Sequence, residues 1–525
     1  MIPLSRLSPQ IRHLRSSASC EVSYNNRLVS KPSVILRFIA LALCVCALQT
    51  TVFGFSLLGP YTRWMTVNTG YHLEGDLGGP MNIDEGYRWN VPVVTYGFDP
   101  EFTAYFGDRG VRAIEEAISI LNELPPASDI DLDSYPLCSS MPNFKAAGLG
   151  LCDLKSAALA GLLEQMGLAD PIRSAFVLRQ RTVYSTFTNY FIIGRNFDPY
   201  SFELSSVVNG ASFGYSVAES SWMPPFFADA FEYRIDLPGV PVDPVASGGP
   251  RGGVFLTGLT RDDVGGLRFS LRRENWKVES LLPDVTAALG NSNEVVQVAS
   301  RPGVEKIEFV RMQRTEGQFL PLTNLFTDTF VTDQGCQQQE LQRVSREPDI
   351  LFTAADLGMK FFFDDQYLYV ATVRTWARTD TSNWQNNAGL NNRPSGAGPG
   401  IIRPSATITF NKMGRYSEAH LGNPQFYSFP AWGSFDEDPD DIAPFPGNET
   451  ATSVTVNASV IRDGAQPMFD WKLLIKTNAI YRIQTTTNLT DWITVASLTN
   501  TSEGFTTFRY PASDPSRSLR AVLAP

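Results

Sequence analysis

The chain has 525 residues, of which 43% are hydrophobic, 18% charged and 12% aromatic. This length allows about two to four domains, and the hydrophobic fraction excludes a disordered tail. The aromatic side chains, together with 40 glycines and 35 prolines, favour strands and turns and argue against a helical bundle. The net charge of −11 argues against a general nucleic-acid-binding protein.

Residues 1–54 have the composition of a secretory signal peptide with an extended basic region. They carry six basic residues against one acidic residue, so the rest of the chain has a net charge of about −16. The apolar run from Phe38 to Leu48 precedes Gly54, whose small side chain suits a signal peptidase. This run is shorter than the ~20 residues that a membrane helix needs, and no later stretch reaches that length. We therefore expect an exported protein, extracellular, periplasmic or attached to the cell envelope, without a permanent membrane span.

Three cysteines follow the expected signal peptide. Cys138 and Cys152 are separated by thirteen residues. In an oxidising compartment, a disulfide that closes such a loop stabilises a protein by about 3 kcal/mol. We therefore predict a disulfide between Cys138 and Cys152, the alternative being two buried thiols. Cys336 has no neighbouring histidine and is not predicted to be a nucleophile.

The first region, residues 55–175, is predicted to contain the clearest helices. Residues 55–90 are rich in glycine and aromatic side chains without periodicity, and we expect irregular structure there. A strand is predicted over 90–98. Apolar residues at helical spacing predict one helix over 110–124 and a second over 153–166.

The second region, residues 176–445, alternates between apolar and polar side chains and is predicted to be rich in strands. The clearest strand and hairpin patterns lie at 182–193, 360–373 and 405–410. One helix interrupts them, because Thr260 and Asp263 have the spacing of a capping box. Regions 55–175 and 176–445 could form one domain.

Residues 436–450 (DEDPDDIAPFPGNET) have the composition of an acidic linker, so we place a domain boundary there. Beyond it, residues 451–525 contain six short alternating runs, which predict a small β-sandwich. The predicted fold is therefore α+β and mostly β, with an N-terminal helix-containing part, a large β-rich body and a C-terminal β-sandwich.

Two segments resemble known families. Tyr481–Gln484 and Asn488–Trp492 resemble a fibronectin-type-III-like module found at the C-termini of many secreted bacterial proteins. This resemblance covers about one seventh of the chain and implies an accessory role in spacing, surface attachment or binding. Residues 55–445, with elements such as GPYTRWM, GLTRDDVGGLR and REPDILFTAADLG, resemble a family of uncharacterised exported bacterial proteins, from which no activity carries over.

A third resemblance concerns the first two predicted helices. A strand, an amphipathic helix and a second helix that ends Met-Gly-Leu look like the start of a metzincin protease, whose active helix reads H-E-x-x-H-x-x-G-x-x-H. Aligned on Gly167, the first histidine, the catalytic glutamate and the other two histidines correspond to Ala160, Gly161, Glu164 and Asp170. The resemblance therefore implies a protease fold that has lost its zinc ligands. The alternative is an ordinary structural helix with a buried apolar face.

Histidine is scarce after residue 54, where the chain contains His72 and His420. This scarcity excludes zinc sites with three imidazoles and weakens any proposal of a Ser-His-Asp or Cys-His site. We expect both histidines to lie in loops or irregular segments. Among the carboxylates, Asp262-Asp263 are predicted to lie in the first turn of a helix and Asp364-Asp365 at a hairpin tip.

Asp436, Asp438 and Asp440 alternate like the first ligands of a calcium-binding loop. However, the glycine of the sixth position is replaced by Asp441 and the glutamate of the twelfth by Gly447, so no EF-hand is predicted. The three aspartates are weak calcium candidates, and no other metal or cofactor is predicted.

No catalytic or cofactor-binding residue is predicted from the sequence. We expect a non-enzymatic binding, scaffold or cell-envelope protein, whose ligand is unknown and whose partner is a cell-surface polymer or protein. One alternative is a secreted glycosidase-like hydrolase with paired carboxylates and aromatic loops such as Ser221–Phe227 along its cleft. The other is an inactive, metzincin-like pseudo-protease.

Overall fold

The computed structural model describes residues 53–71, 78–220, 227–236, 243–248, 251–288, 295–315, 317–355, 361–363, 368–370, 377–379, 384–386, 400–412, 415–420, 423–428, 431–446, 456–463, 466–475, 480–486, 493–499, 504–511 and 518–523. Residues 1–52 of the predicted signal peptide, His72 and Asp364-Asp365 lie outside these ranges. Everything below concerns the unit Val52–Pro525.

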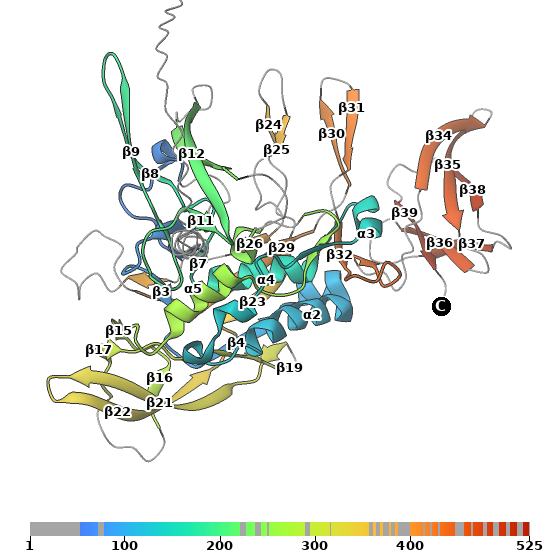
Figure 1. The fold of residues 1–525 in the computed structure, drawn as a ribbon. Helices are drawn as coiled ribbons and strands as arrows, with labels where there is room; N and C mark the ends of the chain where they lie inside the picture. The colour runs from blue at the N-terminus through green and yellow to red at the C-terminus, as the bar shows by residue number, and fades with distance from the viewer. Residues whose placement is uncertain are drawn as a thin grey trace, which may run out of the picture. The chain divides into compact units, whose positions relative to one another are not determined.

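The fold is α+β and mostly β, as predicted (Figure 1). The described residues contain four α-helices, α2 (Pro100–Asn122), α3 (Phe144–Gly148), α4 (Leu154–Gln165) and α5 (Arg261–Leu271), among many short sheets. None of these helices is long and apolar enough to cross a membrane.

A mixed five-stranded sheet lies against α2 and α4 (Figure 1). Its order is β18 (Glu308–Arg311), β4 (Val93–Phe98), β23 (Ile350–Ala355), β29 (Ala406–Asn411) and β26 (Ala377–Thr379). The first four strands are parallel, and β26 runs antiparallel to β29. Parallel strands need long crossover connections, and here these contain the helices and the hairpins of the body.

Helix α2 begins earlier than the sequence pattern predicts. Asp99 caps it, since its Oδ1 accepts a hydrogen bond from the amide of Phe102 at 2.6 Å, and Pro100 occupies the first turn. The helix is interrupted at Gly107, whose φ of +59° favours glycine. Beyond this break it presents the predicted apolar stripe, Val111, Ile114, Ala117, Ile118 and Leu121, to the core.

Helix α4 confirms the second predicted helix. Asp153 caps its start by accepting the amide of Ser156 at 2.9 Å, and Gly167 follows its end with a φ of +87°. Almost every side chain of this helix is buried, because it lies between the sheet and the rest of the body. The indole nitrogen of Trp89 donates to the carbonyl of Gln165 at 2.8 Å and joins the helix to the segment before β4.

Helix α5 has the predicted capping box. The carboxylate of Asp263 accepts hydrogen bonds from the amides of Thr260 (2.9 Å), Val245 (3.0 Å) and Ala246 (2.9 Å). Asp262 accepts the amide of Asn209 at 2.6 Å. Both aspartates are buried, and the amides that they accept explain their presence in the first turn as structural, as the sequence pattern indicates.

The N-terminal segment contains more regular structure than expected. β1 (Phe55–Gly59) is fully buried and pairs with β2 (Gly79–Met81), β7 (Leu168–Ala169) and β10 (Asn196–Phe197). The prediction of irregular structure over 55–90 was therefore wrong for β1, β2 and the short strand β3 (Tyr87–Arg88). Three residue pairs join β1 to β2, and Leu57, Leu58 and Met81 belong to the main core, so the absence of alternation reflects burial on both faces.

Hairpins make up much of the body. The long strands β21 (Leu322–Thr332) and β22 (Gly335–Ser345) form a sheet with β15 (Lys277–Ser280), β16 (Val285–Ala287) and β17 (Val298–Arg301). Two further hairpins are β8 (Val177–Val183) with β9 (Thr188–Ile193), and β12 (Ala211–Ser220) with β13 (Phe227–Arg234). The predicted hairpin at 360–373 is also confirmed, since β24 (Phe361–Phe363) pairs with β25 (Leu368–Val370).

All six strands predicted after residue 450 are present. They form two antiparallel three-stranded sheets, one of β34 (Val456–Asp463), β35 (Gln466–Ile475) and β38 (Gly504–Pro511), the other of β36 (Ile480–Thr486), β37 (Ile493–Thr499) and β39 (Ser518–Leu523). Two such sheets are what a β-sandwich requires.

The predicted acidic linker is wrong for residues 436–446. This segment follows β32 (Ala431–Ser434) and includes β33 (Ala443–Pro444), which pairs with it. Phe435 and Phe445, on either side of the acidic run, are both buried, and the ring of Phe445 lies 5.3 Å from that of Phe106. These two aromatic anchors fix a segment whose charge and proline content resemble those of a linker.

The predicted disulfide is absent. Cys138 and Cys152 are both thiols, and Cys152 is fully buried within β6 (Leu151–Asp153), between the helices and β32. The Sγ of Cys138 lies 3.8 Å from the carbonyl oxygen of Ser140. The short spacing of the two cysteines in the sequence therefore does not lead to a bond between their sulfur atoms. Burial raises the pKa of the Cys152 thiol to about 12.

Candidate ligand-binding pocket

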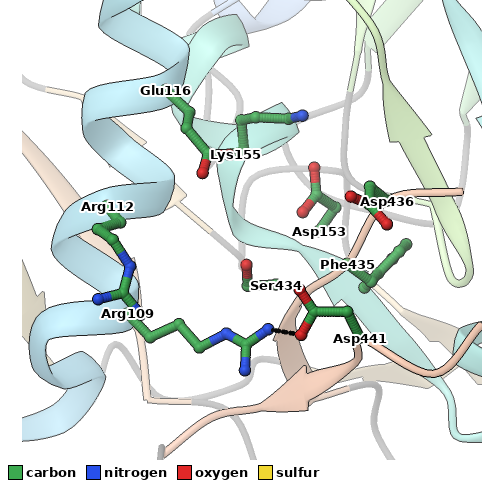
Figure 2. A pocket seen from close by; sticks show the side chains of 9 residues that line it. All are labelled: Arg109, Arg112, Glu116, Asp153, Lys155, Ser434, Phe435, Asp436 and Asp441. Atoms are coloured by element: carbon green, nitrogen blue, oxygen red, sulfur yellow. Dashed lines mark hydrogen bonds and ion pairs between the residues drawn. The ribbon is translucent and has the colours of Figure 1, made fainter. Parts of the chain in front are cut away.

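A cavity of about 350 Å³ lies between α2, the start of α4 and the segment that follows β32 (Figure 2). The parallel pairing of β32 with β6 brings these parts together, although they are almost 300 residues apart in the chain. The side chains that line the cavity are Arg109, Arg112, Glu116, Asp153, Lys155, Ser434, Phe435, Asp436 and Asp441.

One wall of the cavity is a polar face of α2. Arg109, Arg112 and Glu116 share this face because they are three and four residues apart, on the side away from the apolar stripe. The guanidinium of Arg109 pairs with the carboxylate of Asp441. Arg112 is exposed and has no hydrogen-bond or ion-pair partner among the described residues.

The opposite wall contains a buried carboxylate. Asp153 is 1% exposed and accepts hydrogen bonds from the amide and the hydroxyl of Ser156. Burial raises its pKa to about 6, although these hydrogen bonds, nearby Lys155 and the amide of Phe435 favour the ionised form. The cap of α4 is therefore also a titratable group at the edge of the cavity.

Two aromatic rings support this wall. The Nζ of Lys155 lies 6.0 Å from the ring centroid of Phe255, and that ring packs edge-on against Phe435 with 6.3 Å between centroids. Phe435 is buried, so the chain that carries Ser434 and Asp436 is held against the body.

The acidic segment folds upon itself. The amide of Asp438 donates to Oδ1 of Asp436 at 2.8 Å, and the amide of Asp440 donates to Oδ1 of Asp438 at 2.8 Å. Asn143 donates its Nδ2 to the carbonyl of Asp436 at 2.8 Å, and Lys145 pairs with Asp440 at 3.2 Å. The side chains of the three calcium candidates thus bind backbone amides and a lysine. Within the described ranges, no three His, Cys, Asp or Glu side chains lie close enough to hold a metal ion.

The positions that correspond to the metzincin ligands do not form a site either. Ala160 and Gly161 are buried in α4, and Glu164 is half-buried. Asp170 accepts the amides of Ile172 (2.9 Å) and Arg173 (3.2 Å) and the hydroxyl of Ser247, so it shapes a turn. A sheet does lie against the first two long helices, as the resemblance implies, but the kinship itself stays a prediction.

His72 lies outside the described residues. His420 is the last residue of β30 (Arg415–His420), opposite Asn423 of β31 (Asn423–Ser428), so the prediction of a loop position was wrong for His420. Cys336 lies exposed near the start of β22.

A second surface with exposed aromatic side chains lies on the hairpins β8–β9 and β12–β13, here called the hairpin pair. Figure 1 shows the ribbons of β8, β9 and β12. Arg181 and Tyr190 both donate to Oε1 of Glu219, at 2.6 and 2.7 Å, and so join the two hairpins. Tyr184 and Phe187 stack at the turn of the first hairpin, with 4.7 Å between ring centroids. Of the aromatic loop Ser221–Phe227, considered above for a sugar cleft, residues 221–226 lie outside the described residues and Phe227 begins β13.

The cavity was not predicted from the sequence. Two signals pointed toward it: the charged face of the helix predicted over 110–124, and the aspartate that caps the helix predicted over 153–166. Neither indicates that residues 434–441 complete the site.

No family model, no curated protein and no solved structure matches the chain. The function must therefore be argued from the chemistry of the site.

Proposed function

We propose that this is an exported, non-enzymatic binding protein that holds a small polar ligand in the cavity between α2, α4 and β32. The observation that carries the proposal is that Arg112 faces this cavity without a partner among the described residues. A cation of this kind beside a concave surface is available to a ligand at little reorganisation cost.

The size and the walls of the cavity support this function. Its volume of about 350 Å³ lies within the range of about 300–1,000 Å³ that small-molecule sites occupy. The walls are held by the Arg109–Asp441 pair, the cap at Asp153 and the buried ring of Phe435. A site that is already formed loses little entropy when a ligand binds.

The rest of the chain fits a binding role at the cell surface. Export would follow from residues 1–54, and the C-terminal strands β34–β39 would attach or present the larger body. The fibronectin-III-like character of these strands and the envelope location are part of the same proposal.

A binding screen tests it. The purified full chain is screened by thermal shift against amino acids, short peptides, sugars and phosphates, and positives are titrated by calorimetry. We expect at least one class to bind, and Arg112→Ala to weaken binding tenfold or more. Arg346→Ala is the matched control, because Arg346 is an exposed arginine outside the cavity. Binding that is unchanged in Arg112→Ala, or no binding in any class, contradicts the proposal.

A glycosidase-like hydrolase is the second candidate, because two carboxylates, Asp153 and Asp436, line one cavity and the pKa of the first is raised to about 6. An acid with a raised pKa beside a second carboxylate is the pattern of glycoside hydrolysis. However, Asp153 accepts two hydrogen bonds from Ser156 as a helix cap, and acting as a proton donor would disturb that cap. This is why we prefer binding.

Turnover separates the two candidates. The full chain is incubated with a broad panel of glycans, and released sugars are measured. Hydrolysis that is abolished by Asp436→Asn would replace the binding proposal by the hydrolase. Absence of turnover with a ligand that binds supports the binding protein.

A further inference from the structure

We infer that the ligand of this cavity is a zwitterion, an amino acid or a short peptide, whose carboxylate pairs with Arg112 and whose ammonium group faces Asp436 and Asp153. The inference rests on the proposed binding function and names the class of ligand. It is carried by the way in which charges of both signs are distributed around one cavity.

Figure 2 shows this distribution. Arg109 and Arg112 approach from α2 on one side, where Glu116 also lies. The carboxyl groups of Asp153 and Asp436 lie on the other side, together with the ammonium group of Lys155. The lining contains three basic and four acidic side chains, so the cavity has no strong net sign. A simple anion would be attracted by the arginines and repelled by the carboxylates. A simple cation would be attracted by the carboxylates and repelled by the arginines.

The available charges are fewer than the total. Arg109 is already paired with Asp441, whereas Arg112 and Lys155 have no ion pair in the described part of the chain, and Lys155 lies 6.0 Å from the ring centroid of Phe255. Of these two cations, Arg112 is the one whose planar guanidinium can take a ligand carboxylate with two parallel N–H···O bonds.

Asp436 is the matching acid. Its Oδ1 accepts the amide of Asp438 at 2.8 Å, and no described residue donates to its Oδ2. The side chain is exposed at the cavity, so an ammonium group can reach this oxygen. Asp153 lies on the same side and adds negative charge when it is ionised.

Neutral and singly charged ligands fit this lining less well. Charged side chains lose hydration when a ligand covers them, and a neutral sugar does not replace that hydration with opposite charge. A divalent metal ion would meet the guanidinium of Arg112 in the same space. A ligand that carries both charges compensates both walls at once.

The test compares one peptide with its capped forms. Triglycine, N-acetyltriglycine and triglycine amide are titrated into the full chain by calorimetry at pH 7.5. Triglycine is expected to bind, and removing either charge is expected to weaken binding at least tenfold, which equals about 1.4 kcal/mol. Glycine amide and acetate, each carrying one charge, are expected to bind more weakly still.

Two variants assign the two ends. Arg112→Gln is expected to remove the preference for triglycine over triglycine amide and to keep the preference over N-acetyltriglycine. Asp436→Asn keeps an oxygen for the amide of Asp438 and is expected to show the reverse pattern. Arg346→Gln, outside the cavity, is expected to bind all three peptides as the unaltered chain does.

The outcomes distinguish this inference from the proposed function. If the capped peptides bind as tightly as triglycine, the inference of a zwitterionic ligand is wrong and the binding function stands. The same conclusion follows if triglycine does not bind, whereas sugars or phosphate bind tightly and lose affinity in Arg112→Gln. If none of the compounds binds, both fail.

Discussion

The guanidinium of Arg109 on α2 pairs with the carboxylate of Asp441, in the segment whose composition resembles a linker. Both side chains are partly exposed, at 39% and 63%, so the pair contributes less than about 1 kcal/mol to stability. The pair has a larger effect on the cavity, because the carboxylate of Asp441 leaves Arg112 as the unpaired arginine of the two on that wall.

Asp441→Asn is therefore expected to change ligand binding more than stability. Urea unfolding should show that the free energy of unfolding decreases by less than about 1 kcal/mol. Calorimetry should show tighter binding of triglycine, because Arg109 becomes available to the carboxylate beside Arg112. Weaker binding, or a loss of several kcal/mol, would mean that the pair holds the wall in place.

A buried ion pair is expected to behave differently. Arg88 and Glu279 are almost fully inaccessible, and the guanidinium also donates to the carbonyls of Ser270 (3.1 Å), Asn275 (2.6 Å) and Arg301 (3.1 Å). Arg88→Met should cost about 3–5 kcal/mol in urea unfolding, since it leaves a buried carboxylate without its counter-charge.

The double variant Arg88→Met with Glu279→Leu is the control for that experiment. It removes both charges and should recover part of the loss. A double variant that is less stable than Arg88→Met alone would show that the glutamate is stabilised by other groups.

The stability of the protein is expected to fall as the pH rises because of Glu232 on β13. Burial, with the nearby charges of Asp170 and Asp229, raises its pKa to about 9, whereas the unfolded chain has the ordinary value near 4.5. Between these two values the folded state binds more protons than the unfolded state, so this contribution is complete below pH 4.5 and is lost by pH 9.

Glu232→Gln should flatten the dependence of the unfolding free energy on pH between about 5 and 9. The measurement is urea unfolding at several pH values. An unchanged slope in Glu232→Gln would show that Glu232 does not titrate in this range.

Lys277 acts in the opposite direction, because burial lowers its pKa from 10.5 to about 7 and its contribution to stability is lost as the pH falls through that value.

The hairpin pair is expected to tolerate polar substitution. Tyr184 and Phe187 are 51% and 59% exposed, so Tyr184→Ser and Phe187→Ser should change stability by about 0.5 kcal/mol or less. By contrast, Phe102 is fully buried in the aromatic cluster beside β23, so Phe102→Ala should lower the free energy of unfolding by about 3–5 kcal/mol. Thermal or urea unfolding measures both. A large loss at Tyr184 or Phe187 would place their rings in a contact that the described residues do not contain.

Local chemistry was predictable from the sequence where it depends on neighbouring residues. Thr260 and Asp263 show the capping box directly, and the apolar stripe from Val111 to Leu121 shows the helix. The start of α2 was missed because two glycines, Gly107 and Gly110, lie between Phe106 and that stripe, and glycine disfavours a helix.

The cavity could not be predicted, because it depends on pairing between distant strands. β6 and β32 meet only in the folded chain, and their pairing places Asp436 and Asp441 beside Arg109 and Arg112. Composition was misleading here, since the acidic run looks like a linker until Phe435 and Phe445 are seen to be buried. The spacing of Cys138 and Cys152 was misleading for a similar reason, because Cys152 is held in β6 against β32, whereas Cys138 lies outside the strands, before β5 (Ser140–Pro142).

The most direct measurement is a crystal structure of the full chain with triglycine bound. The account predicts density for the peptide in the cavity between α2 and β32, with its carboxylate within hydrogen-bond distance of Arg112 and its amino group beside Asp436. Peptide density elsewhere, for example on the hairpin pair, with the cavity lining unchanged, would contradict it.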